Sequence, residues 1–319
     1  MRILATAEVP AAGREAFARL GQIDVRPLDD VGALTAAEVL IVRGTRLGAD
    51  ALHRASSLRA IARTGAGYDN IDVAAATSRG IPIVYAPGVG SQPVAEGTVA
   101  LMLAAAKRLP ELAAVVHDRR WSARYAVAGL DLEGACLGIV GLGSIGRRVA
   151  RLCRGLGMHV IAHDPAFAGH AALDAELVPL DELVARADVI SLHCELTDRT
   201  RGLVDRALLA RVKPGAILVN VARGEIIESE EALAEALASG RLSAVALDVF
   251  PLEPPDTSHH LYADPRVLCT PHAVGLTARW NEQVFHSLAQ GVESVLAGEL
   301  PPNVLNPEAL TPRASRVGD

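Results

Sequence analysis

Residues 136–164 constrain the fold of this chain more than any other part of its sequence. A short apolar run, Cys136–Val140, predicts a buried strand, and three glycines follow it in the spacing G-x-G-x-x-G, within Gly141–Gly146. Ile145–Leu156 then predicts a helix, and a second apolar run, Met158–Ala162, predicts another strand. The stretch therefore predicts a strand–turn–helix–strand unit of the kind that builds parallel sheets.

The glycine spacing has a specific physical meaning in such a unit. Gly141 permits a tight turn, Gly143 lets the backbone approach a pyrophosphate, and Gly146 lets the helix pack closely on the strand. The free N–H groups of Ser144 and Ile145 lie at the helix N-terminus, where the helix dipole favours an anion. Glycines alone also occur in ordinary turns, but the strand, helix and second strand in register favour a dinucleotide site.

Asp164 ends the second strand of this unit, 18 residues after Gly146, the last glycine of the motif. A carboxylate at this point can accept hydrogen bonds from the adenosine ribose, and its charge repels a 2′-phosphate. The sequence therefore predicts NAD (NADH) as the cofactor, preferred over NADP.

Length, composition and net charge limit the classes of protein to which this chain can belong. A chain of 319 residues is long enough for two domains, and hydrophobic residues make up 50% of it, which suffices for a core in each. A net charge of −6 without a basic block argues against nucleic acid or an anionic membrane as a partner. No apolar run has the length of a membrane span, and the N-terminal segment does not resemble a signal peptide, so we expect a cytoplasmic protein.

The cysteines and the histidine pair predict no metal site. Cys136, Cys153, Cys194 and Cys269 show neither a C-x-x-C pair nor the spacing of zinc ligands, and we expect reduced thiols. His259–His260 lies in a polar loop without a third group at metal-ligand spacing.

Apolar runs that predict strands alternate with runs that predict helices along almost the whole chain. This α/β pattern predicts two Rossmann-like or flavodoxin-like parallel-sheet domains with a cleft between them. Besides the glycine unit, the expected strands are Arg2–Ala7, Val39–Arg43, Leu58–Arg63, Ile83–Ala86, Val189–Cys194, Ala216–Val221, Ala244–Val249 and Val267–Thr270.

Val94–Arg119 predicts one long helix that Pro110 interrupts and can kink. Its first half is apolar on most faces, so we expect it to pack between domains or subunits. Glu230–Ala238, which precedes Gly240, and Ala278–Ala297 predict further helices.

Three polar residues follow successive strands of the second lobe: Arg223, Glu253 and His272. Ligands of open parallel sheets bind beyond the carboxyl ends of the strands, so these side chains are candidates for one site. An Arg can hold a substrate carboxylate and polarise its carbonyl, a His can donate a proton, and a carboxylate can orient that His. These are the groups that a 2-oxo acid reductase needs, and the N–H groups of Ala66 and Gly67 could bind the other carboxylate oxygen.

Each member of this set has an ordinary structural explanation when taken alone. Arg223 could be a surface charge, His272 a turn histidine with satisfied hydrogen bonds, and Glu253 a solvated loop acid between prolines. Their order after successive strands of a dinucleotide domain favours the functional interpretation.

The chain resembles the NAD-dependent D-isomer-specific 2-hydroxyacid dehydrogenases over nearly its whole length. The segments that carry the resemblance are RTGAGYDNID at 63–72, PVAEGTVALMLAAAKRLPE at 93–111, LGIVGLGSIGRRVA at 137–150, ADVISLHCELTDRT at 187–200, ILVNVARGEIIE at 217–228, ALDVFPLEPP at 246–255 and CTPHAVGLT at 269–277.

The resemblance implies that Arg223 binds substrate, that Glu253 tunes the histidine, and that His272 is the proton donor. It assigns cofactor contacts to the glycine motif (Gly141, Gly143 and Gly146) and to Ser144, Ile145, Asp164, Val221, Ala222, Arg223, Asp248, His272 and Gly275. Substrate contacts are expected from Arg43, Ala66, Gly67 and Arg223.

The resemblance also implies a discontinuous substrate domain, residues 1–95 plus 290–319, around an NAD domain at 96–289. Family members are usually dimers joined through the NAD domains, which suits the apolar helix near residues 94–109.

Three positions depart from the family pattern. Glu195 stands where Pro is frequent, Gly90 where Asn is frequent in the loop facing the substrate, and Glu228 where Asp is usual. Because Glu253 is kept, the formate-oxidising branch, in which that Glu is replaced, is disfavoured.

The sequence thus predicts an oxidoreductase that moves a hydride between NAD(H) and a small 2-oxo acid/D-2-hydroxy acid pair, of the glyoxylate, hydroxypyruvate or 3-phosphohydroxypyruvate type. The alternative is an NAD(H)-sensing interaction protein, like the corepressors that share this fold and can keep the Arg/Glu/His set.

Overall fold

The computed structural model describes residues 1–167 and 174–311. The chain divides into two compact units, Met1–Gly90 with Leu276–Asp319, and Ser91–Gly275. The expected domain boundary at 289/290 falls inside the continuous helix α11 (Ala278–Leu296), which packs on α1 (Ala11–Phe17) of the first unit. Within the described residues, no helix is both long and apolar enough to span a bilayer.

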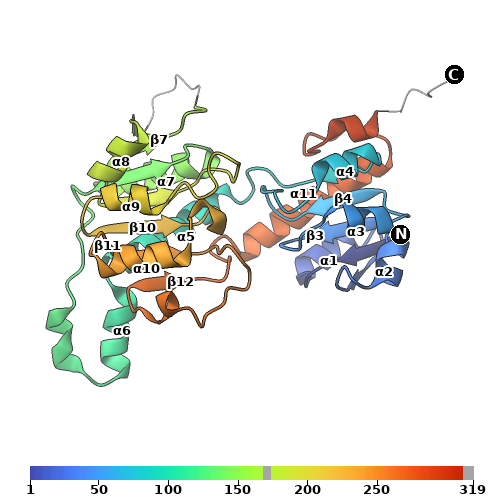
Figure 1. Cartoon of the computed structure of the whole chain (residues 1–319). Helices are drawn as coiled ribbons and strands as arrows, with labels where there is room; N and C mark the ends of the chain where they lie inside the picture. Colours follow the sequence, from blue (N-terminus) through green and yellow to red (C-terminus); the bar gives the residue numbers. More distant parts are fainter. Residues whose placement is uncertain (168–173, 312–319) are drawn as a thin grey trace. The chain divides into compact units, whose positions relative to one another are not determined.

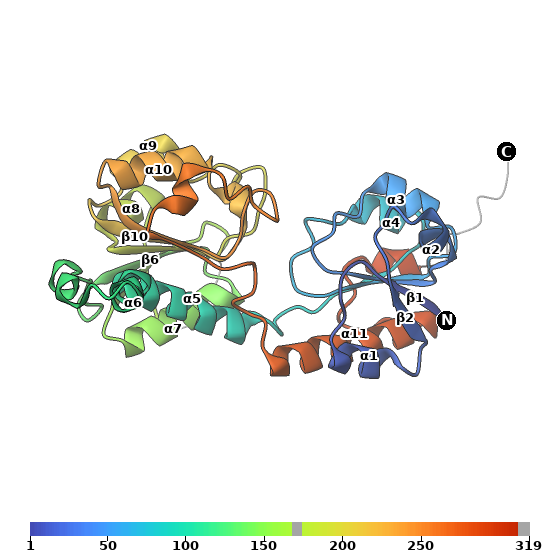
Figure 2. The same cartoon turned by 90° about the horizontal axis from the view of Figure 1, so that it is seen from below.

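The first unit is built on a parallel five-stranded sheet with the order β2-β1-β3-β4-β5. Its strands are β1 (Arg2–Ala5), β2 (Gln22–Val25), β3 (Val39–Val42), β4 (Ala60–Arg63) and β5 (Ile83–Val84). Helices α1 and α11 cover one face of this sheet (Figure 2). The other face carries α2 (Val31–Ala36), α3 (Ala49–Arg54) and α4 (Val73–Ser78), and the 3-10 helix η4 spans Pro307–Leu310.

The second unit contains a parallel seven-stranded sheet with the order β12-β11-β10-β9-β6-β7-β8. Its strands are β6 (Cys136–Val140), β7 (His159–His163), β8 (Glu176–Leu177), β9 (Val189–Leu192), β10 (Ala216–Asn220), β11 (Leu242–Leu247) and β12 (Val267–Cys269). The helices are α5 (Ser91–Ala106), α6 (Leu109–His117), α7 (Ser144–Gly155), α8 (Leu180–Arg186), α9 (Arg206–Arg211) and α10 (Glu230–Ala238), with 3-10 helices η1 (Trp121–Ala126), η2 (Gly224–Ile226) and η3 (His260–Ala263). The two sheets confirm the predicted fold class.

Helices cover both faces of the second sheet, with α5 and α7 on one side and α8, α9 and α10 on the other (Figures 1 and 2). Strands β9 and β10 are buried along their whole length, which explains why they read as continuous apolar runs. Gly138 in β6 lets α8 lie close, because a Cβ there would be 2.5 Å from Leu183 Cδ2.

The long helix predicted over 94–119 is two helices, α5 and α6, and this prediction was wrong. The break lies at Arg108, whose φ of 49° is left-handed, and Pro110 lies in the first turn of α6 rather than at a kink. Proline suits a first turn because its missing N–H has no partner there. The buried side of α5 packs within its own unit, against α7 and the sheet.

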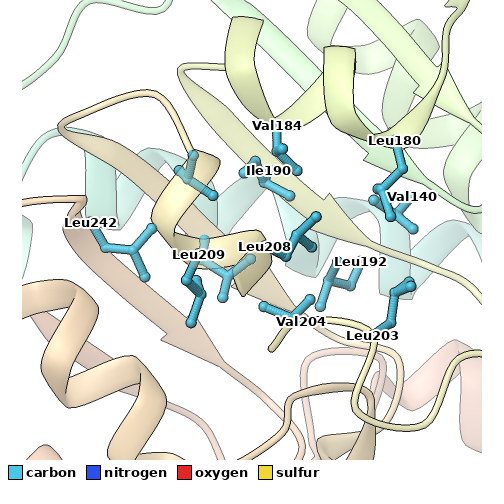
Figure 3. Close-up of a pocket in the computed structure, with 12 residues that line it drawn as sticks. Val140, Leu180, Val184, Ile190, Leu192, Leu203, Val204, Leu208, Leu209 and Leu242 are labelled. Atoms are coloured by element: carbon cyan, nitrogen blue, oxygen red, sulfur yellow. The ribbon is translucent and has the colours of Figure 1, made fainter. Parts of the chain in front are cut away.

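The interior between the sheet and helices α8 and α9 holds a small apolar void of about 10 Å³ (Figure 3). Only aliphatic side chains line this void, and they include leucines and valines of β6, β9 and α9. A void of this size with no polar partner would not hold an ordered water, so it is a packing feature of the core and not a ligand site.

Candidate active site

The strand order of the second unit places a topological switch point between β6 and β9. From β6 the chain proceeds outward through β7 and β8 on one side, and from β9 through β10, β11 and β12 on the other. Such switch points leave a crevice beyond the carboxyl ends of the strands, where open α/β sheets bind their ligands.

The three motif glycines fill three different steric roles at this point. Gly141 has φ +96°, and a Cβ on it would lie 2.5 Å from the backbone N of Cys194. A Cβ on Gly146 would collide with the carbonyl oxygen of Gly141, so α7 can approach β6 only with glycine there. Gly143 has nothing within 4 Å of its Cβ position, so it leaves space beside the N-terminus of α7. This arrangement fits a dinucleotide pyrophosphate.

Ser144 and Ile145 begin the twelve-residue helix α7, as the motif predicts. The Ser144 hydroxyl lies 2.8 Å from that of Ser91, which begins α5. The start of α5 is thereby tied to the glycine loop, a contact that the sequence did not indicate.

Asp164 follows β7 and holds the glycine loop as well as the strand end. Its Oδ2 accepts a hydrogen bond from the backbone N of Leu142 at 2.8 Å, and its Oδ1 accepts one from Ala166 N at 3.0 Å. A carboxylate has about four acceptor positions, so the oxygens keep capacity for ribose hydroxyls. Nδ1 of the neighbouring His163 lies 3.1 Å from the carbonyl oxygen of Val178.

His272 and Glu253 form a direct pair. Nδ1 of His272 lies 2.8 Å from Oε2 and 3.1 Å from Oε1 of Glu253. Because an ionised carboxylate only accepts, Nδ1 carries a hydrogen and Nε2 is left for another partner. The ring is about half exposed, which leaves it accessible.

Several groups act on the Glu253 carboxyl. Partial burial works to raise its pKa, but the hydrogen bond and charge of His272, the N–H of Phe250 and the charge of Arg223 together hold that pKa below its usual value. Glu253 is therefore an anion at neutral pH. The contribution of Arg223 also shows that its guanidinium acts electrostatically on the pair.

A buried acid fixes the turn that carries His272. The His272 backbone has a left-handed φ of 51°. Asp248, which follows β11, accepts hydrogen bonds from Thr270 Oγ1 at 2.7 Å and from Ala273 N at 2.8 Å. Burial raises the pKa of Asp248, although these hydrogen bonds and the charge of His272 oppose the shift. Asp248 therefore orients the turn, a role that the sequence did not assign to it.

Arg223 lies in a turn held by Asn220 at the end of β10. The Asn220 amide Nδ2 donates to Arg223 O at 2.8 Å, and its Oδ1 accepts from Ala222 N at 3.0 Å. Gly224 lets this turn lie against the backbone of Phe250, because a Cβ there would collide with it. The turns after β10, β11 and β12 thus bring Arg223, Glu253 and His272 into one electrostatic group.

The remaining predicted cofactor residues lie in the same unit. Val221 and Ala222 directly follow β10. Gly275 lets its segment approach α5 closely, because a Cβ on it would lie 2.6 Å from Val94 Cγ2.

The predicted substrate residues of the first unit follow β3 and β4. Arg43 directly follows β3, and Ala66 and Gly67 lie in the loop after β4. Asn70 ties the two loops together, because its Nδ2 donates to Arg43 O at 3.2 Å and to Thr45 O at 2.8 Å. Gly65, with φ +138°, lets the backbone turn at the start of the loop.

His193, which follows β9, is a neutral residue. Desolvation lowers its pKa to about 3, and its Nε2 lies 2.8 Å from Ser191 Oγ. It therefore cannot act as a charged acid at neutral pH.

The structure brings Glu231 to His259 and His260, a grouping that the sequence spacing did not indicate. The three donor atoms lie within 4.8 Å of one another, and His259 Nε2 is 3.4 Å from Glu231 Oε2. However, His259 Nδ1 accepts a hydrogen bond from Leu261 N, so a neutral ring carries its hydrogen on Nε2. That hydrogen faces the carboxylate, which favours a hydrogen-bonded cluster over a metal site.

A protein-family model for the NAD-binding domain of D-isomer specific 2-hydroxyacid dehydrogenases matches residues 99–274. The chain belongs to this family. D-3-phosphoglycerate dehydrogenase of Mycobacterium tuberculosis is 40% identical over 294 residues, which cover 89% of this chain and 55% of the relative. The enzyme of the same name from Methanocaldococcus jannaschii is 43% identical over 274 residues, covering 85% and 52%. The chain thus spans about half the length of these curated relatives.

Several solved structures match this chain almost end to end. The TT0316 protein from Thermus thermophilus has a TM-score of 0.88 at 36% identity, covering 96% of this chain and all of its own. A glyoxylate reductase from Paecilomyes thermophila has a TM-score of 0.83 at 30% identity, covering 95% and 97%. D-lactate dehydrogenase from Aquifex aeolicus, in complex with NAD and lactic acid, has a TM-score of 0.84 at 26% identity. The match covers 95% of this chain and 98% of that one.

The glycine loop generates a prediction with an internal control. Gly143→Ala should fold normally, because its Cβ position is open. It should nevertheless weaken NADH binding by about tenfold or more, because the methyl group would occupy the place of the pyrophosphate. Gly146→Ala should instead lower the melting temperature by several degrees, because its Cβ meets the Gly141 backbone. Thermal unfolding and NADH fluorescence titration measure both. Unchanged NADH affinity in Gly143→Ala would contradict the assignment of this loop.

Proposed function

We propose that this protein interconverts a small 2-oxo acid and the corresponding D-2-hydroxy acid with NADH and NAD. The observation that carries the proposal is the His272–Glu253 pair, grouped electrostatically with Arg223 at the strand ends of a sheet whose glycine loop fits a dinucleotide. Family membership supports the same reaction class.

Each group has one role in the proposed reaction. Bound NADH supplies the hydride to the carbonyl carbon. Arg223 binds the substrate carboxylate and polarises the carbonyl, and Nε2 of His272 donates the proton to the carbonyl oxygen. Glu253 keeps the imidazole oriented through Nδ1 and stabilises its protonated form. We assign the N–H groups of Ala66 and Gly67 to the remaining carboxylate oxygen.

Asp164 supports a preference for NADH over NADPH. Its carboxylate is fixed at the end of β7 by two backbone N–H groups, so it cannot swing away from an adenosine ribose bound there. A 2′-phosphate at that ribose would place two anions together.

We also propose a homodimer joined through the NAD-binding unit. Helix α6 and η1 extend away from the sheet of that unit (Figure 1), and they expose large apolar side chains. Trp121 is 64% exposed and Tyr125 81%, with Arg124 stacked on both rings, and Leu109 and Val116 of α6 are also exposed. Exposed apolar groups gathered in this way are typical of protein interfaces. The four free thiols are consistent with a cytoplasmic location.

The alternative function is an NAD(H)-sensing interaction protein. Such a protein would bind NADH through the same glycine loop but would turn over no 2-oxo acid. Turnover therefore separates the two functions.

Purified protein should oxidise NADH in the presence of at least one of glyoxylate, hydroxypyruvate, pyruvate and 3-phosphohydroxypyruvate. NADPH should be the poorer reductant in a parallel series, because Asp164 repels its 2′-phosphate. Absorbance of the reduced nicotinamide follows the reaction. Tight NADH binding without turnover of any acid would favour the sensing protein, and equal efficiency with NADPH would remove the assignment of Asp164.

Glu253→Gln should shift the pH dependence of reduction. The reaction needs a protonated His272, so activity falls as rising pH removes that proton. The Glu253 carboxylate accepts the Nδ1 hydrogen bond of His272 and favours the charged imidazole, so its loss should move the fall to lower pH. Rate–pH profiles of the wild type and the variant measure this shift. Superimposable profiles would contradict the proposed pairing.

A further inference from the structure

The segment that follows β9 lies directly against the glycine loop. A Cβ on Gly141 would be 2.5 Å from the backbone N of Cys194, and His193 N donates a hydrogen bond to Val140 O at 2.7 Å. Strand β6 lies between β7 and β9 in the sheet. The residues after β9 therefore adjoin the glycine loop on one side, and Asp164, after β7, adjoins it on the other.

Glu195 is an exposed acid in this segment, and its side chain has no partner of its own. Within residues 1–167 and 174–311, its carboxylate forms neither an ion pair nor a hydrogen bond. Burial raises the pKa of the neighbouring Cys194 thiol to about 11, and the negative charges of Asp164 and Glu195 add to this effect. Two carboxylates, from the ends of two different strands, thus act on the same point beside the glycine loop.

The backbone of Glu195 is held in place by a closed turn. Its carbonyl oxygen accepts a hydrogen bond from Thr200 Oγ1 at 2.5 Å, and Thr200 Oγ1 in turn accepts one from Thr197 N at 2.7 Å. The position of the Glu195 Cα is therefore fixed, although its carboxylate is exposed.

The chemistry of a carboxylate limits what Glu195 can recognise on a dinucleotide. An ionised carboxylate only accepts hydrogen bonds. The adenosine half of NAD offers donors from two places, the ribose hydroxyls and the exocyclic amine of the adenine, because the unsubstituted ring nitrogens of the base are acceptors. Asp164 accounts for the ribose hydroxyls. The amine is the donor that remains for a second carboxylate.

We propose that the Glu195 carboxylate accepts a hydrogen bond from the exocyclic amine of the adenine of bound NAD(H). Asp164 and Glu195 then divide the adenosine between them, with the ribose at the end of β7 and the base at the loop after β9. This inference rests on the proposed function, whose cofactor it concerns, and it makes Glu195 a residue that determines specificity for the base.

The test compares the binding of NADH with that of its etheno analogue. In the analogue a two-carbon bridge joins the exocyclic nitrogen of the adenine to the adjacent ring nitrogen, so this edge of the base carries no N–H group. The discrimination ratio is the Kd of the etheno analogue divided by the Kd of NADH, both from fluorescence titration. The wild type should have a ratio of about 5 to 20, because a hydrogen bond to a charged acceptor is lost.

Two variants separate the hydrogen bond from the size of the side chain. Glu195→Ala should bring the ratio close to one, chiefly by weakening NADH binding. Glu195→Gln keeps the size but loses the charge, so its ratio should fall between those of the wild type and Glu195→Ala. Asp198→Asn removes the same charge from another exposed position of this loop and should leave the ratio unchanged. Thermal unfolding verifies that each variant is folded.

Three results would overturn the assignment of Glu195. The first is a wild-type ratio near one. The second is a wild-type ratio in Glu195→Gln, which would show that the side chain excludes the etheno bridge by its size alone. The third is a gain in NADPH affinity in both variants at an unchanged ratio, which would make Glu195 only a charge that repels a 2′-phosphate.

The proposed function fails in a different way. If the wild type binds NADH with the expected ratio but reduces no 2-oxo acid, the assignment of Glu195 stands and the proposed reaction is contradicted.

Discussion

The buried carboxylate of Asp248 is the constraint on which the geometry of the candidate site depends. It joins the end of β11 to the turn after β12 through Thr270 and the backbone N–H of Ala273. A carboxylate without hydrogen-bond donors would be costly in this buried position. Asp248 therefore holds the turn in the conformation that supplies these donors. The left-handed backbone of His272 follows from that fixed turn, and the ring reaches Glu253 as a result.

Asn220 has a comparable role at the end of the neighbouring strand, β10. Asn220 is the last residue of β10 and Asp248 directly follows β11. Both are buried, and each uses its side-chain polar atoms to hold a turn that carries a candidate catalytic residue. Arg223 and His272 thus project from turns fixed by buried polar groups rather than from free loops. Preorganised turns of this kind suit proton transfer and carboxylate binding, because the groups need not reorder during reaction.

Local sequence patterns predicted the parts of the fold that depend on close packing. The apolar runs of β6, β9 and β10 and the steric needs of Gly141 and Gly146 are readable because a buried parallel strand or a close backbone approach tolerates few residue types. Short elements escaped prediction. β2 and β8 lie at sheet edges and expose much of their length, so they lack a continuous apolar run.

Contacts between distant segments could not be predicted from one sequence. The second role of Asp164, on Leu142 N, the Ser91–Ser144 contact and the approach of Glu231 to His259 all depend on tertiary placement. The break at Arg108 also went unpredicted, because Pro110 permits either a kink or a new helix start. The chemical types of Arg223, Glu253 and His272 were readable, but their grouping needed the strand order.

The central claim is that Nε2 of His272 delivers the proton. The most direct measurement is the rate of 2-oxo acid reduction by the His272→Ala variant, together with its affinity for NADH. The control is His260→Ala, which changes an exposed histidine of the polar loop. The account predicts a rate loss of about 10²–10⁴-fold with NADH binding retained and a normal rate in the control. Near-normal turnover by His272→Ala would contradict it.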